Sequence, residues 1–388
     1  MRQELSLLKT IREKALSNRA LRSEVLDDSY FRVAPSDLRF AGITLALWQK
    51  RLLKALTDTA VDADAVDTRW VQNVWHVVDS GWVRKFCLGG EKSVLHSLKT
   101  IANAKPVARQ ELYHEFCRQN KVGKMLDGGG NFRDIGDLPE FTPELADAVK
   151  KFFGRCYALL SHNKKRNWNG YEFNGNRCIT NHAYKDAFCS DYPTKAVCPY
   201  CDGEIGTPEL DHYLAKSGFP LLACSPWNLI PVCKSCNDTV TAKGDRPAIT
   251  LGPPRSTDDW LHPFFRPASA QVRIELKGTR QDAIPQLHSP DSAEQIRLSN
   301  HEGLIQSLSK RWTNVATAHL EVLIPQVKAR LNAENSVKSL VNTKLEDHLA
   351  SRGKEASSMV RAAVCRAFLD GRPGFFEEFD NPNAPVLD

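Results

Sequence analysis

Apolar residues recur at helical spacing through the first 160 residues of the chain. Residues 5–20 place five apolar side chains close to one helical face: Leu7, Leu8, Ile11, Ala15 and Leu16. Four further segments have helical spacing: residues 38–56, 68–82, 94–104 and 110–119. Thr142, followed by Glu144, is typical of a helix N-terminus. The pattern predicts a mainly helical N-terminal region.

The amino-acid composition changes in the middle of the chain. Asn, Gly, Pro and aromatic residues dominate residues 167–267, where apolar runs are short. This composition is typical of a loop-rich unit that needs a metal to stay folded. Residues 272–277 alternate between apolar and polar side chains, which predicts a strand.

Helical spacing then returns at residues 292–311, 313–331, 336–351 and 354–369. We expect the tail at residues 371–388, which is rich in Pro and Gly, to pack loosely. The predicted fold class is α+β: a small metal-bearing core between two helical regions. The predicted boundaries are residues 1–166, 167–285 and 286–388.

Composition narrows the classes of protein that the chain can belong to. Of its 388 residues, 42% are hydrophobic and 25% are charged, which argues against a wholly disordered chain. The longest apolar runs, such as residues 41–48, are far shorter than the roughly 18–20 residues that a membrane span needs. The first residues lack the pattern of a signal peptide. We therefore expect a soluble cytoplasmic protein with no membrane partner.

Positive charge gathers at one place along the chain. The net charge is +6, and residues 149–171 contain no acidic residue. The basic residues of this segment are Lys150, Lys151, Arg155, Lys164, Lys165 and Arg166. Such a surface attracts polyanions, phosphate backbones first. We predict that Lys164, Lys165 and Arg166 contact nucleic acid, although a solvated loop explains them nearly as well.

The cysteines have an uneven distribution. Four of the eleven form two Cys-x-x-Cys pairs, separated by 31 residues: Cys198 with Cys201, and Cys233 with Cys236. Two such pairs can supply the four thiolates of a tetrahedral structural zinc site. Buried free thiols or a single redox-active pair are the alternatives, and the presence of a second pair disfavours both. We interpret the isolated cysteines as core residues or inert surface thiols.

The segment between the two pairs carries polar residues suited to phosphodiester hydrolysis. That reaction needs a base for the attacking water and a cation for the developing charge. His212 is suited to the first role, and Asp211 precedes it, so that the two side chains point to opposite faces of an extended strand. Asn237, directly after Cys236, offers an amide oxygen for a hard divalent ion.

This arrangement resembles the HNH endonuclease family, whose members share the ββα-metal fold. The resemblance covers about residues 195–265. Asp211-His212 is similar to the family's first-strand Asp-His, Asn228 to the central Asn that begins the second strand, and Asn237 to the third position at the start of the helix. Lys243 resembles a family feature flanking the core, and we expect it to contact nucleic acid.

The resemblance implies a role for each matched residue. His212 would be the general base, Asp211 and Asn237 the ligands of one catalytic divalent ion, and Asn228 the residue that orients His212. Asn in place of His at position 237 favours Mg²⁺ or Mn²⁺, which prefer oxygen donors. A direct catalytic role and a plain turn-forming role are the alternatives for Asn228. Water attack would leave a 5′-phosphate and a 3′-hydroxyl.

The leading hypothesis is a metal-dependent HNH endonuclease that acts on DNA. The helical regions could form a homo-oligomer or dock an ATPase or sensor subunit, and stand-alone HNH proteins of this kind resemble effector nucleases of bacterial anti-phage defence. Two alternatives stay open: a non-catalytic zinc module that binds nucleic acid or protein, in which His212 is a buried histidine, and a nuclease that acts on RNA.

Two further histidines, His182 and His262, lie outside the motif. We interpret His262 as a packing or hydrogen-bonding residue.

Overall fold

The computed structural model combines helices with two small antiparallel sheets, in agreement with the predicted α+β class. It describes residues 37–75, 80–88, 93–122, 125, 131–160, 197–238, 242–250, 255–263, 265–280, 282–331 and 336–375. The predicted helix at residues 5–20, the basic residues Lys164, Lys165 and Arg166, and His182 lie outside these ranges.

The N-terminal region is helical, as predicted. Its α-helices are α3 (Asp37–Leu56), α4 (Thr68–Trp75), α5 (Ser80–Leu88), α6 (Val94–Asn103), α7 (Pro106–Gln119) and α9 (Pro143–Leu160). Thr142 begins α9, where its hydroxyl accepts a hydrogen bond from the Leu145 N–H at 3.2 Å. Trp75 is a central core residue that stacks on Trp48 and donates its indole N–H to the Trp48 carbonyl at 3.0 Å. The prediction of one continuous helix at residues 68–82 is wrong, because the structure has two separate helices there, α4 and α5.

The residues of the middle region that the structure describes hold little regular structure. Strand β1 (Glu209–His212) pairs antiparallel with β2 (Leu229–Val232), and the four-residue helix α11 (Lys234–Asn237) follows directly. Two short 3₁₀ helices, η3 (Pro220–Leu222) and η4 (Pro226–Asn228), lie in the connection between the strands. All four residues of β2 are buried, so this strand forms the centre of the unit.

In its described residues, the C-terminal region combines a β-hairpin with four helices. Strand β3 (Arg273–Lys277) confirms the predicted strand and pairs with β4 (Ile284–His288), which the sequence pattern did not indicate. The helices are α12 (Ser292–Leu304), α13 (Leu308–Lys328), α14 (Val337–Ala350) and α15 (Ser358–Leu369). The hairpin packs against α12, α13 and α15.

Three details of this region differ from the prediction. Residues 292–311 were predicted as one helix, but α12 ends at Leu304 and α13 begins at Leu308. The start of the tail packs tightly rather than loosely, because Phe375 is fully buried against Phe368, with ring centroids 5.3 Å apart. The predicted boundary at residue 285 falls inside β4. The division into three domains stays a prediction.

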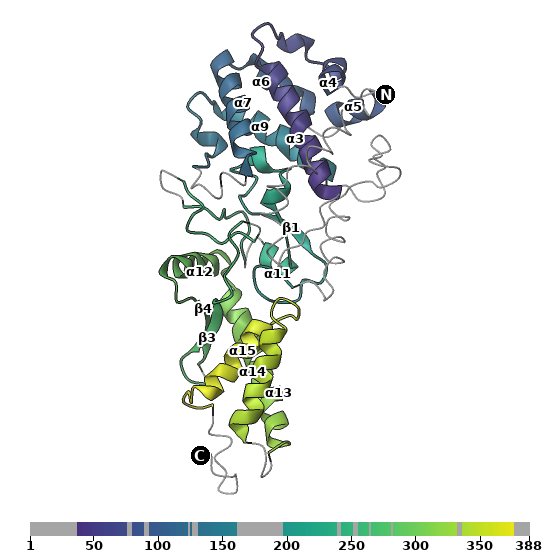
Figure 1. Cartoon of the computed structure of the whole chain (residues 1–388). Coiled ribbons are helices and arrows are strands. Elements are labelled where there is room, and N and C mark those ends of the chain that lie inside the picture. Colours follow the sequence, from purple (N-terminus) through teal and green to yellow (C-terminus); the bar gives the residue numbers. More distant parts are fainter. Residues whose placement is uncertain are drawn as a thin grey trace, which may run out of the picture.

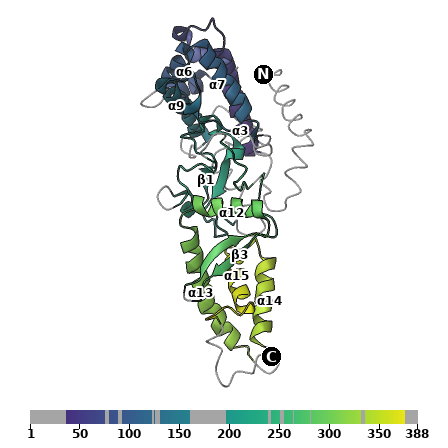
Figure 2. The same cartoon turned by 90° about the vertical axis from the view of Figure 1, so that its left-hand side faces the viewer.

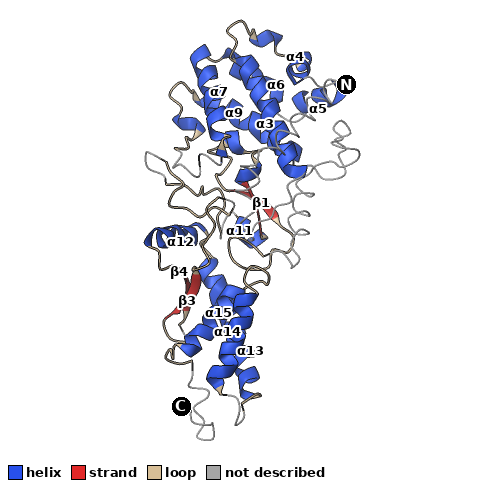
Figure 3. Ribbon diagram, viewed as in Figure 1, coloured by secondary structure: helices blue, strands red, loops and turns tan. Residues whose placement is uncertain are grey.

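The molecule is elongated in two perpendicular views (Figures 1 and 2). The N-terminal helices lie at one end, the C-terminal helices lie at the other, and β1 and α11 lie between them. Loops make up most of this central part (Figure 3). Both ends contact it: α3, α7 and α9 pack on η3 and η4, and Trp312 of α13 donates its indole N–H to the Cys201 carbonyl at 2.8 Å.

His262 makes the stability of the central region sensitive to acid. Its side chain is fully buried, and Nε2 lies 3.1 Å from the Trp227 carbonyl. Burial lowers the pKa of His262 to about 3, whereas an unfolded histidine titrates near pH ~6.5. Protons therefore bind the unfolded chain first as the pH falls below ~6.5, so the stability contributed by His262 is complete above that pH and is lost towards pH 3.

We expect the thermal midpoint to be lower at pH 5.5 than at pH 7.5. Replacing His262 with Gln should lower the midpoint at pH 7.5 and reduce the difference between the two pH values. The exposed His96 on α6 provides the matched control, His96→Gln, which should leave the difference unchanged. An unaltered pH dependence in His262→Gln would contradict the argument.

Candidate metal centre and strand site

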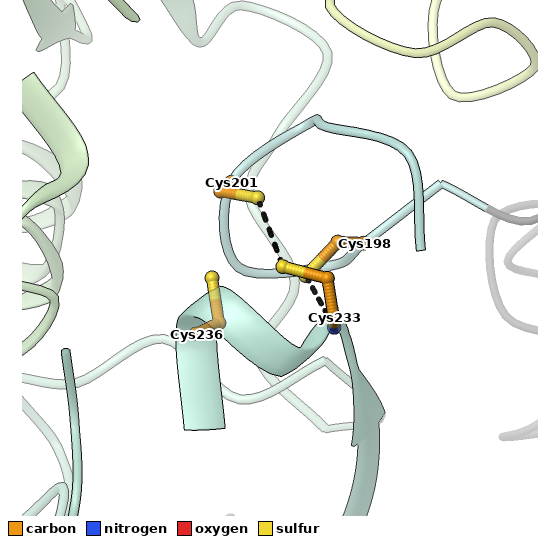
Figure 4. Close-up of side chains that lie close together, drawn as sticks. All are labelled: Cys198, Cys201, Cys233 and Cys236. Atoms are coloured by element: carbon orange, nitrogen blue, oxygen red, sulfur yellow. Dashed lines mark hydrogen bonds between the residues drawn. The ribbon is translucent and has the colours of Figure 1, made fainter. Parts of the chain in front are cut away.

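The four cysteines of the two Cys-x-x-Cys pairs meet in the structure. Their sulfur atoms all lie within 4.8 Å of one another, and each residue is at most 7% exposed. Cys198 and Cys201 come from a turn before β1, Cys233 follows β2, and Cys236 lies in α11 (Figure 4). All four thiols are free. The predicted convergence of the two pairs is confirmed.

The geometry of this four-cysteine cluster suits a metal ion such as zinc. The Cys201 and Cys233 sulfurs are 3.7 Å apart. Zn–S bonds of about 2.3 Å in a tetrahedron place two sulfurs about 3.8 Å apart. The Cys233 N–H also donates to the Cys198 sulfur at 3.3 Å. The four residues can therefore hold a metal ion at a buried tetrahedral centre.

Helix α13 supplies a positive charge to this cluster. Arg311 Nη2 lies 3.2 Å from the Cys236 sulfur, and Nη1 lies 3.9 Å from the Cys233 sulfur. Burial works against the charge on Arg311, but the neighbouring sulfurs, Cys236 first, raise the pKa of its guanidinium overall. The guanidinium in turn favours the thiolate form, which is the form that binds metal. Sequence analysis missed Arg311, because its role depends on a contact across 75 residues of chain.

Asp211 is buried and has two protein partners. Its Oδ1 accepts from the Lys243 ammonium at 3.0 Å, and its Oδ2 accepts from the Tyr200 hydroxyl at 2.8 Å. Burial raises the pKa of Asp211, while Lys243 acts in the opposite direction. Because each carboxylate oxygen has two lone pairs, these two bonds leave acceptor capacity on both atoms.

Lys243 does not occupy the position that the sequence suggested. Its side chain is 0% exposed, and its ammonium also donates to the His212 carbonyl at 2.7 Å. A buried ammonium cannot contact a phosphate backbone, so the expected nucleic-acid contact is corrected to a structural ion pair with Asp211. Lysine is seldom fully buried unless it is paired, which is why residue type alone suggested a surface position.

His212 lies on the opposite face of β1 from Asp211, as strand alternation requires. Its Nε2 is 3.1 Å from the Ala223 carbonyl, and its ring lies edge-on to Tyr157 of α9, with centroids 4.5 Å apart. A carbonyl only accepts hydrogen bonds, so Nε2 carries the proton in this contact and the ring's lone pair is on Nδ1. Burial, followed by the charge of Lys216, lowers the pKa of His212 to about 3. The imidazole is therefore neutral at physiological pH.

Asn228 fixes the connection between the two strands. Its Oδ1 accepts from the Leu214 N–H at 2.7 Å, and its Nδ2 donates to the carbonyls of Leu214 and Leu222 at 3.0 and 3.3 Å. These contacts are all to backbone groups, so they favour a turn-fixing and orienting role for Asn228 over a direct catalytic one. Leu222 precedes Ala223, whose carbonyl holds His212, so Asn228 positions the imidazole through the backbone.

Asn237 reaches the Asp211 face of β1. Its Nδ2 donates to Glu209 Oε2 at 2.9 Å, and both side chains are half-buried. Glu209 and Asp211 are two residues apart on the strand and therefore share a face. Glu209 was missed by the sequence analysis, although this same alternation could have indicated it.

Comparisons with protein-family models, with curated proteins and with solved structures found no match to the chain. Across the described parts of the chain, no helix combines the length and apolar character needed to cross a membrane.

The Asp211–Lys243 pair should behave as a coupled buried ion pair. Replacing Lys243 with Met leaves a buried carboxylate without its ammonium, which should lower the free energy of unfolding by about 3–5 kcal/mol. Asp211→Asn should also destabilise, and the double substitution should cost less than the sum of the two single ones. Urea unfolding measures all three variants.

The control for this double-mutant cycle is Lys277→Met, which removes a half-exposed lysine paired with Glu275. Its effect should stay within about 1 kcal/mol. The assignment fails if Lys243→Met is as mild as this control, or if the double substitution is strictly additive.

Proposed function

We propose that the chain is a metal-dependent endonuclease of the HNH type that hydrolyses DNA phosphodiester bonds. The observation that carries the proposal is the distribution of polar groups about β1. His212 lies on one face, and Asp211 lies on the other together with Glu209, which Asn237 contacts at 2.9 Å. The order of two antiparallel strands followed by α11, beside the four-cysteine cluster, also supports it.

His212 is suited to accept the proton of the attacking water. Its imidazole is neutral, the Ala223 carbonyl fixes Nε2 as the protonated nitrogen, and Nδ1 keeps the lone pair. In the proposed reaction, water attacks phosphorus, Nδ1 takes a proton from that water, the bond from phosphorus to the 3′ oxygen breaks, and the leaving oxygen takes a proton from solvent water. The products are a 5′-phosphate and a 3′-hydroxyl.

The Asp211 face of β1 provides oxygen donors for a hard divalent ion. The proposed ligands are the Asp211 carboxylate and the Asn237 amide oxygen, and Glu209 adds a second carboxylate that offsets the charge of Lys243. Mg²⁺ or Mn²⁺ bound there would neutralise charge on the phosphate and the leaving oxygen. Lys243 and Tyr200 hold Asp211 in position for this task.

The four-cysteine cluster is proposed to hold Zn²⁺ in a structural role. Four buried sulfurs, the absence of disulfides among them and the Arg311 guanidinium support this assignment. In the proposal the zinc fixes the ends of the β1–β2 unit and takes no part in the chemistry. A partner subunit, a homo-oligomer and a role in anti-phage defence stay predictions.

A second candidate function is a non-catalytic zinc module that binds nucleic acid or protein. The burial of the site favours it, because His212 is only 9% exposed and the Asp211 carboxylate is in an ion pair. It predicts tight zinc binding without dependence on added Mg²⁺. An RNA-directed nuclease would keep the same residues and change the substrate.

Cleavage assays separate these functions. The chain is incubated with supercoiled plasmid, linear duplex and structured RNA in Mg²⁺ or Mn²⁺. We expect the DNA substrates to be cut, and His212→Ala to slow cleavage about 10²–10⁴-fold because the base is lost. The exposed His96 again gives the control, His96→Ala, which should cut at the wild-type rate.

Zinc content and circular dichroism of His212→Ala should match the wild type, which separates loss of chemistry from loss of fold. Full activity in His212→Ala would refute the base assignment. Cleavage of RNA alone would move the proposal to the RNA nuclease. Intact substrates with a folded, zinc-loaded wild type would favour the non-catalytic module.

A further inference from the structure

A second cluster of metal-ligating side chains lies among the C-terminal helices, apart from the proposed nuclease site. It consists of His319 of α13, His348 of α14 and Cys365 of α15. One ring nitrogen of each histidine and the Cys365 sulfur lie within 4.8 Å of one another, and the two rings are 5.0 Å apart. Residues 319, 348 and 365 are far apart in sequence, so no spacing motif could have indicated them.

The two half-buried histidines of this cluster differ from the buried histidines of the described residues in what their Nε2 atoms contact. Nε2 of His212, His262 and His301 each lies 2.7–3.1 Å from a backbone carbonyl. Nε2 of His319 and of His348 is buried and has no hydrogen-bond partner among the described residues. Buried polar atoms nearly always have a hydrogen-bond partner. A metal ion that accepts a lone pair from each histidine would supply the missing interactions.

We propose that His319, His348 and Cys365 form a second metal site, which takes a late first-row divalent ion such as Zn²⁺. Two imidazole nitrogens and one thiolate sulfur form a donor set that binds Zn²⁺ or Co²⁺ more tightly than Mg²⁺ or Ca²⁺. Three protein ligands leave a fourth tetrahedral position for water. The ligands come from three helices, so the bound ion links α13, α14 and α15 to one another.

The surroundings of the cluster affect the protonation of all three proposed ligands. Burial is the first cause that lowers the pKa of His319 to about 4, and Arg361 and Lys344 act in the same direction. Both imidazoles are thereby kept neutral, which is the form that binds metal. Burial raises the pKa of the Cys365 thiol to about 12, although Lys344 and Arg366 act in the opposite direction, so a metal ion must displace the thiol proton as it binds. The acidic groups Asp347 and Glu355 face His348 and offset part of this positive charge.

Metal stoichiometry of the full-length protein tests the site without reference to activity. The protein is equilibrated with Zn²⁺, freed of excess metal and measured by elemental mass spectrometry. His319→Gln, His348→Gln and Cys365→Ser, singly and together, should each lower the zinc content by one ion per chain. His114→Gln, at an exposed position on α7, should leave it unchanged.

A spectroscopic measurement identifies the ligands of the lost ion. With Co²⁺ in place of Zn²⁺, the difference between wild-type and His348→Gln spectra should show tetrahedral d–d bands and a thiolate charge-transfer band. A folded triple variant that keeps the wild-type zinc content would overturn the proposal. So would a difference spectrum without the thiolate band.

A measurement on the wild type alone covers the case in which the variants fail to fold. Hydrogen exchange is followed as the metal-free protein takes up Co²⁺. We expect the peptides of α13, α14 and α15 around residues 319, 348 and 365 to gain protection. Uptake that protects only residues 198–236, around the four-cysteine cluster, would refute the second site.

Discussion

The convergence of four sulfurs is the constraint on which the central region depends. Among its described residues, this part of the chain has two four-residue strands, the four-residue helix α11 and two short 3₁₀ helices, so loops carry most of it. The four cysteines bring the turn before β1, the end of β2 and the first turn of α11 together. A metal ion bound there would link these segments and so hold the register in which Asp211 lies opposite Ile230 and His212 opposite Leu229.

Both helical regions contribute to this centre. From the C-terminal side, Arg311 and Trp312 of α13 contact the cysteine turns, and His301 of α12 contacts the Tyr200 carbonyl at 2.7 Å. From the N-terminal side, Asn120 donates to the Leu221 carbonyl at 3.1 Å, and Tyr157 lies against His212. The loops of the central region are therefore held by side chains that lie far away in sequence.

Sequence reasoning found what depends on local spacing. The two Cys-x-x-Cys pairs, the opposite directions of Asp211 and His212, and most of the helices follow from periodicities of a few residues. Strand β4 was missed because its sequence, Ile-Pro-Gln-Leu-His, contains a proline. Proline has no backbone N–H to donate to a neighbouring strand, so its presence argued against a strand here. The break between α12 and α13 comes just after Gly303, a residue type that often marks a helix end, but the apolar spacing continues past it and periodicity alone joined the two helices.

Contacts over long sequence distances could not be predicted in the same way. The burial of Lys243 depends on Asp211, 32 residues earlier, and the partner of Asn237 depends on how α11 packs on β1. His319, His348 and Cys365 are ordinary helix residues until three helices bring them together. Nothing local distinguishes such residues from solvated or core positions.

The contact between Tyr157 and His212 has a consequence for how the protein can be divided. Helix α9 forms one wall around the imidazole, so residues 195–265, excised alone, would expose that ring and the apolar surface beneath η3 and η4 to solvent. The β1–β2 unit and the helical arm that precedes it therefore behave as one structural unit, and moving residues 195–265 onto another scaffold requires a substitute for that wall.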